Sequence, residues 1–138
     1  MGMNPPSVLI DLSFLTAVAD TDHTNHVEAV AIYRTLIDDF LAQRHLLFAR
    51  VDHLAAAGNA DLFAPIDKLH IARQHRNAAN EVMRGTPVDI DLAITLVLIH
   101  RMKIRRVATF DERLSDYDLD LVRPTAVCRA PDPGIDQR

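Results

Sequence analysis

Short apolar segments with the length of β-strands alternate with helical segments along this chain. Four segments rich in apolar and β-branched residues are predicted as strands: 7–10, 46–51, 105–110 and 119–122. Helical spacing of apolar residues predicts helices at 26–42, 68–83 and 90–102, with a short alanine-rich turn of helix after residue 51. Residues 62–65 are compatible with a further extended piece. The alternation predicts an α/β fold, a three-layer α/β/α sandwich with helices on both faces of a mainly parallel sheet.

The size and composition of the chain fit one globular domain. Its 138 residues are enough for a single core, and a hydrophobic content of 49% is too high for a disordered chain. We assign residues 1–128 to this domain. Residues 129–138 contain prolines and a glycine and have no apolar face, so they are predicted to form a flexible C-terminal tail.

The cysteine content and the apolar segments bear on where the protein works. Its single cysteine, Cys128, excludes an intramolecular disulfide and a zinc site built from several cysteines. The first residues lack the basic and apolar regions of a signal peptide, and the longest apolar run, 92–99, is too short to span a bilayer. We therefore expect a cytoplasmic protein with no membrane partner.

The net charge of −4 does not indicate a nucleic-acid binder on global electrostatics alone. Contact with phosphate would have to come from a local basic patch or from bound metal. The densest basic cluster is Arg101, Lys103, Arg105 and Arg106. These cations are expected to complement the C-terminal end of a helix, at the edge of the sheet opposite the acids described next.

Acidic residues follow the predicted strands at the points where the strands end. Asp11, Asp52 and Asp111 each come after a strand, and Asp91 lies in the first turn of the apolar helix 90–102. The carboxyl ends of parallel strands meet at one edge of a sheet, so these carboxylates are expected to converge and to need a cation between them. Oxygen ligands of this kind suit Mg²⁺ or Mn²⁺, and the chemistry implied is metal-assisted phosphodiester hydrolysis.

Some of these acids also have a structural interpretation. Asp52 is balanced between a metal ligand and the N-cap of the short helix, and Asp89 is assigned to capping the helix 90–102. Asp116 is expected to be a solvated loop residue. The seven histidines show no metal-ligand spacing, and Cys128 has no identifiable base, so neither supports a different catalytic centre.

Three motifs resemble those of PIN-domain nucleases. Residues 8–13, VLIDLS, are similar to the opening strand of that family, in which an aspartate is followed two positions later by Ser, Thr or Asn. Residues 91–94, DLAI, resemble the family's third acid at the head of an apolar helix, and residues 107–114, VATFDERL, its Thr-x-Asp strand end. The loop before residue 26 is similar to that of the toxin-type members called VapC. The resemblance extends from residue 7 to 124.

The resemblance implies a Mg²⁺- or Mn²⁺-dependent endoribonuclease that is the toxin of a type II toxin–antitoxin pair. It implies Asp11, Asp52, Asp91 and Asp111 as catalytic residues, with the metal on Asp11, Asp91 and Asp111. It also implies that Ser13 and Thr109 support the acids and that Arg113 contacts the scissile phosphate. An RNA substrate, a small antitoxin and a homodimer are the implied partners.

Asp52 stands where the family usually has glutamate, and this departure keeps a second hypothesis open: a catalytically impaired PIN-like module that binds a protein or an RNA. Two other classes are less compatible with the residues. A haloacid-dehalogenase-like phosphatase needs a second acid where Ser13 stands. A phosphoacceptor receiver domain needs adjacent acids after the first strand and a lysine after the last, and the chain has neither.

Overall fold

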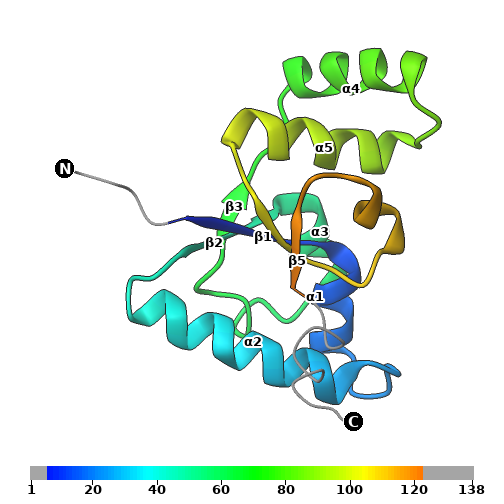
Figure 1. Ribbon diagram of the computed structural model, residues 1–138. Coiled ribbons are helices and arrows are strands. Elements are labelled where there is room, and N and C mark those ends of the chain that lie inside the picture. The colour runs from blue at the N-terminus through cyan, green and yellow to red at the C-terminus, as the bar shows by residue number, and fades with distance from the viewer. Residues whose placement is uncertain (1–5, 123–138) are drawn as a thin grey trace, which may run out of the picture.

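A parallel five-stranded sheet forms the centre of the molecule (Figure 1). The structure is a computed structural model, and it describes residues 6–122. The strand order is β3-β2-β1-β4-β5, and the bounds are β1 Ser7–Ile10, β2 Leu46–Arg50, β3 Asp67–Leu69, β4 Arg106–Ala108 and β5 Asp120–Val122. The tail predicted at 129–138 and Cys128 lie outside the described residues.

Helices cover both faces of this sheet, as the three-layer prediction requires. The helices are α1 Leu12–Ala19, α2 His26–Leu41, α3 Val51–Ala57, α4 Arg73–Gly85 and α5 Ile90–Met102, and a 3₁₀ turn, η1, spans Glu112–Asp116. Strand residues alternate between two cores, because Val8 and Ile10 pack with α1 and α2, whereas Leu9 packs with α5. The predicted α/β/α sandwich with a parallel sheet is therefore confirmed.

Helix α1 is an element that the sequence prediction missed. Its residues follow β1 directly, and four of the eight, Phe14, Leu15, Ala17 and Val18, are buried. A short helix that is apolar around most of its circumference gives little helical periodicity, so the pattern did not distinguish it from the end of the strand. The first helix of the fold is consequently α1, and the predicted helix at 26–42 is the second.

The region between residues 58 and 72 was also predicted incorrectly. Residues 62–65 form turns, and the additional strand is β3, which pairs in parallel with β2 at the edge of the sheet. Two of its three residues, Asp67 and Lys68, are exposed, so it lacks the apolar run of a buried strand. Helix α4 begins at Arg73, five residues later than the predicted helix at 68.

Helix α5 is the buried helix that the sequence predicted. Seven of its residues are buried, it packs against β4 and α4, and Asp89 caps it by accepting a 2.8 Å hydrogen bond from the Leu92 backbone N–H. The predicted capping role of Asp89 is confirmed. None of the helices between residues 6 and 122 has the length and apolarity that a bilayer crossing requires.

Candidate active site at the carboxyl edge of the sheet

Asp11 occupies the centre of the candidate site. It follows the last residue of β1, the middle strand, and caps α1, and only 9% of its surface is exposed. Its Oδ2 accepts hydrogen bonds from the Ser13 hydroxyl at 2.8 Å and the Thr109 hydroxyl at 2.9 Å, with the Ser13 backbone N–H at 3.4 Å. All these bonds go to one oxygen, so the carboxylate is held in one orientation and no described residue bonds Oδ1.

The two hydroxyls beside Asp11 connect β1 to the end of β4. Thr109 is fully buried, and its Oγ1 accepts a 2.9 Å hydrogen bond from the Asp111 backbone N–H. The Ser13 Oγ accepts one from the Phe110 backbone N–H, also at 2.9 Å, and lies 3.1 Å from the Thr109 Oγ1. Asp11 and Asp111 are therefore tied to the same threonine, although 100 positions separate them in the sequence.

Asp111 and Asp89 share one arginine at the exposed side of the site. Asp111 caps η1 and is held in a fork by Arg113, with Nη2 2.7 Å and Nε 3.0 Å from its carboxylate oxygens. The third nitrogen, Nη1, lies 3.1 Å from Asp89. Hydrogen bonds from Arg113 lower the pKa of the Asp111 carboxyl against a smaller opposing effect of burial. The arginine predicted to contact phosphate is thus bonded to two carboxylates.

A second arginine, Arg50, holds the other pair of predicted acids. It is the last residue of β2 and is buried, and its Nε and Nη2 donate to the two oxygens of Asp52 at 3.0 and 2.6 Å. Its Nη1 lies 3.0 Å from Oδ1 of Asp91 and donates to the Asp91 carbonyl at 2.8 Å and the Thr95 hydroxyl at 2.9 Å. Arg50 therefore neutralises charge on both Asp52 and Asp91.

Asp52 does not cap the short helix. Arg50 occupies the N-cap position of α3, and Asp52 lies in the first turn with about half of its side chain exposed. Partial burial tends to raise its pKa, but the hydrogen bonds and positive charge of Arg50 together lower it. The capping interpretation of Asp52 is wrong, because the side chain is directed to the guanidinium instead.

His53, which the sequence did not indicate, lies beside the same acids. It is buried, and its Nε2 is 3.2 Å from Oδ1 of Asp91. Within residues 6–122, Asp52, His53 and Asp91 form a group of potential metal ligands whose atoms all lie within 4.8 Å of one another. Asp11, Asp91 and Asp111 form no such group in that range. Sequence reasoning missed Arg50 and His53. The signal that could have indicated them is Arg50 itself, a charged residue at the end of an apolar strand and close to Asp52.

The residues at this edge fit a divalent cation in charge and in ligand type. The site has five carboxylates and two guanidinium groups: Arg50 and Arg113 pair with Asp52, Asp91, Asp89 and Asp111, and Asp11 is bonded by hydroxyls alone. With all five carboxylates ionised, the two arginines leave a net charge of −3 on these seven side chains. The expected repulsion among carboxylates is thus relieved in part by the protein's own cations, and open carboxylate oxygens such as Oδ1 of Asp11 suit a hard cation.

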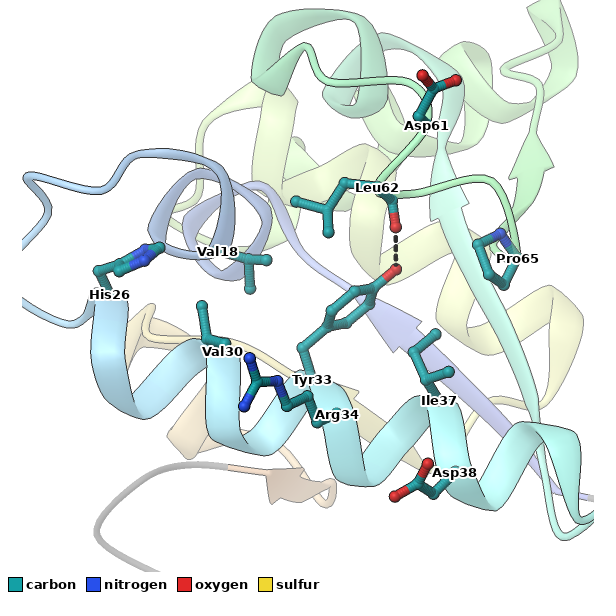
Figure 2. A pocket seen from close by; sticks show the side chains of 10 residues that line it. All are labelled: Val18, His26, Val30, Tyr33, Arg34, Ile37, Asp38, Asp61, Leu62 and Pro65. Atoms are coloured by element: carbon teal, nitrogen blue, oxygen red, sulfur yellow. Dashed lines mark hydrogen bonds between the residues drawn. The ribbon is translucent and has the colours of Figure 1, made fainter.

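A separate groove lies away from the acids, between α1, α2 and the turn at 61–65 (Figure 2). It has a volume of about 650 Å³, and its apolar lining includes Val30, Ile37 and Leu62. Tyr33 reaches across it and donates a 2.7 Å hydrogen bond to the Leu62 carbonyl, and burial raises the pKa of this tyrosine to about 12. None of the carboxylates at the sheet edge lines this groove.

Acid should weaken the stabilisation that Asp111 provides. Because its pKa is lower in the folded protein than in the unfolded chain, the stabilisation is complete above the unfolded value of about 3.9 and is lost as pH falls through the folded value. The wild type should therefore be more stable than Asp111→Asn at pH 7, with a difference that shrinks below about pH 4. Urea unfolding of both proteins from pH 7 to pH 3 measures this, and a difference independent of pH would contradict it.

The five-stranded parallel sheet with helices on both faces matches the fold of a PIN-domain toxin of known structure. A solved structure with this fold is that of VapC20 from Mycobacterium tuberculosis, described as a sarcin–ricin loop cleaving toxin. The TM-score is 0.59 at 12% sequence identity, and the match covers 81% of this chain and 98% of VapC20. No protein-family model matches the sequence, and no curated protein does. The VapC-like PIN fold predicted from the motifs is confirmed, and at this identity the likeness shows the fold alone.

Proposed function

We propose that the chain is a metal-dependent endoribonuclease that hydrolyses RNA phosphodiester bonds at the carboxyl edge of its sheet. The observation that carries the proposal is the arrangement of Asp11: a carboxylate directly after the middle strand, fixed through one oxygen by two hydroxyls, with acids after the strands on both sides. A turn residue would not need such fixation, whereas a metal ligand gains affinity when its orientation is set in advance. The fold shared with the VapC20 toxin supports the same function.

In this proposal the metal, Mg²⁺ or Mn²⁺, is held by Asp11, Asp91 and Asp111. When bound there, it would activate a water molecule and stabilise charge on the scissile phosphate. Ser13 and Thr109 keep Asp11 oriented by donating hydrogen bonds to its inner oxygen. Asp91 is paired with Arg50 through Oδ1, and Asp111 is paired with Arg113, while Oδ2 of Asp91 carries no bond from a described residue.

Arg113 is proposed to contact the RNA phosphate, and its two carboxylate partners determine which of its nitrogens would do so. Its fork is occupied by Asp111, and its Nη1 is bonded to Asp89, whose side chain is more than half exposed. Of the two ion pairs, the one with Asp89 is the more exposed. A phosphate would therefore replace Asp89 at Nη1, while Asp111 stays bound to Nε and Nη2.

A second function is favoured by one observation, the neutralisation of Asp52 and Asp91 by Arg50. A PIN-like module without catalysis, binding a protein or an RNA, would not need a metal at these acids. For either function we propose a cytoplasmic homodimer with a small antitoxin as partner, on the strength of the fold shared with a toxin.

The two functions differ in their response to metal. The proposed nuclease should cleave structured RNA, including a ribosomal stem–loop panel, only after Mg²⁺ or Mn²⁺ is returned to chelator-treated protein. Gel analysis of labelled RNA, with the cleaved fraction measured against metal concentration, distinguishes them. RNA that is bound but never cut at any metal concentration would favour the non-catalytic module.

A further inference from the structure

Arg50 lies among three side chains that have the arrangement of a metal site. The ligand atoms of Asp52, His53 and Asp91 lie within 4.8 Å of one another, and two carboxylates with one imidazole suit a divalent transition metal. The Arg50 guanidinium binds both carboxylates, at 2.6 Å and 3.0 Å. A cation is therefore already present where a metal would be expected.

The burial of Arg50 shows that this cation is a fixed part of the protein. Its side chain is 3% exposed, whereas the Asp52 and Asp91 side chains are 48% and 54% exposed. Each of its three guanidinium nitrogens is bonded, with the Asp91 carbonyl and the Thr95 hydroxyl completing the set around Nη1. Every guanidinium nitrogen thus has a partner, and the buried side chain offers an RNA phosphate no exposed face, which excludes substrate contact as the role of Arg50 in this arrangement.

A purely structural ion pair would not require the neighbouring imidazole. His53 is as buried as Arg50, and its Nε2 approaches the same oxygen of Asp91 that Arg50 approaches. One carboxylate oxygen thus faces both groups, as it would face a metal and a second ligand. Oδ2 of Asp91 has no bond from a described residue.

We propose that Arg50 is a resident cation that takes the place of a metal ion at Asp52, His53 and Asp91. Metal used for RNA hydrolysis is then held by Asp11 and Asp111, with Asp91 contributing only the oxygen that Arg50 does not bind, a part of the inference that rests on the proposed function. Asp52 binds the guanidinium instead of the metal.

The test is to remove the resident cation and measure metal binding directly, without RNA. Arg50→Gln should melt at a lower temperature than wild type in chelator, because the carboxylates of Asp52 and Asp91 then lack their cation. It should bind Mn²⁺ with a dissociation constant at least about tenfold lower than that of wild type, and Mn²⁺ should raise its melting temperature more. Calorimetric titration and thermal melts give both quantities.

Three further variants make the result specific. Arg106→Gln removes another partly buried arginine, paired with Asp120 at 3.1 Å on β4, and should gain no Mn²⁺ affinity. His53→Ala added to Arg50→Gln should abolish the gain. Arg50→Lys retains a positive charge, so it should fold and bind Mn²⁺ no more tightly than wild type.

Several outcomes would overturn the proposal. These are an unchanged Mn²⁺ affinity in Arg50→Gln, a gain that survives loss of His53, and an equal gain in Arg50→Lys. If Arg50→Gln fails to fold even in saturating Mn²⁺ while Arg50→Lys folds, the metal cannot replace the guanidinium and the proposal is also wrong. Absence of RNA cleavage by the wild type would not alter these results, so failure of the proposed function is distinguishable.

Discussion

Replacement of Phe14 by alanine should lower the free energy of unfolding by about 3–5 kcal/mol, the usual cost of removing a buried phenylalanine. Phe14 lies in α1 and is completely buried, and its ring stacks on Phe110 with centroids 5.5 Å apart. In the sequence, Phe14 follows Asp11 by three positions and Phe110 directly precedes Asp111. The cavity left by Phe14→Ala would therefore loosen the part of the core that positions the ends of β1 and β4.

Urea unfolding of wild type and Phe14→Ala measures this change. Val27→Ala is the control, because Val27 lies on α2 with 79% of its surface exposed and should change stability by less than about 0.5 kcal/mol. A loss below about 1 kcal/mol for Phe14→Ala would mean that α1 does not pack on the sheet as described.

The acids at the sheet edge could be predicted because their signals are local. Asp11 and Asp111 each follow a short apolar strand, and parallel strands place such residues at one edge. The hydroxyls of Ser13 and Thr109 lie two positions after and two before these acids, so the motif already contained the groups that bond Asp11. For β1 and β4, the apolar strand pattern and the sequence motif both placed the acid at the end of the strand.

Helix α1 and strand β3 could not be predicted in the same way. In α1, residues on most sides of the helix are buried, which removes the alternation of apolar and polar residues that identifies a surface helix. In β3, Asp67 and Lys68 are exposed at the edge of the sheet, so only the pairing with β2 makes the segment a strand. Tertiary contacts determine both elements.

The role of Arg50 also depends on contacts distant in the sequence. Asp91 and Thr95, which bond Arg50, are 41 and 45 positions away from it in the sequence. Nothing in the sequence near residue 50 indicates that the start of α5 lies beside it. The sequence therefore suggested four repelling carboxylates, whereas the structure pairs three of them with arginines. Charge balance across a site is a property of the folded chain and has no local pattern.

Asp11→Asn should reduce RNA cleavage by more than about 100-fold, because loss of a metal ligand should cost more than the 10–100-fold typical of the groups that orient such ligands. The amide retains an oxygen that can accept from Ser13 and Thr109, and it keeps the shape of the side chain. The melting temperature without metal should consequently change little. Asp116→Asn, in η1 and exposed, is the matched control and should cleave at the wild-type rate.

The most direct test of the account is the rate at which wild type and Asp11→Asn cleave one structured RNA under single-turnover conditions, in Mg²⁺ or Mn²⁺ and in chelator. We expect metal-dependent cleavage by the wild type and by Asp116→Asn, and cleavage reduced by more than about 100-fold in Asp11→Asn. Equal rates for wild type and folded Asp11→Asn, or cleavage by the wild type that persists in chelator, would contradict the claim that the carboxyl edge of this sheet is a metal-dependent nuclease site.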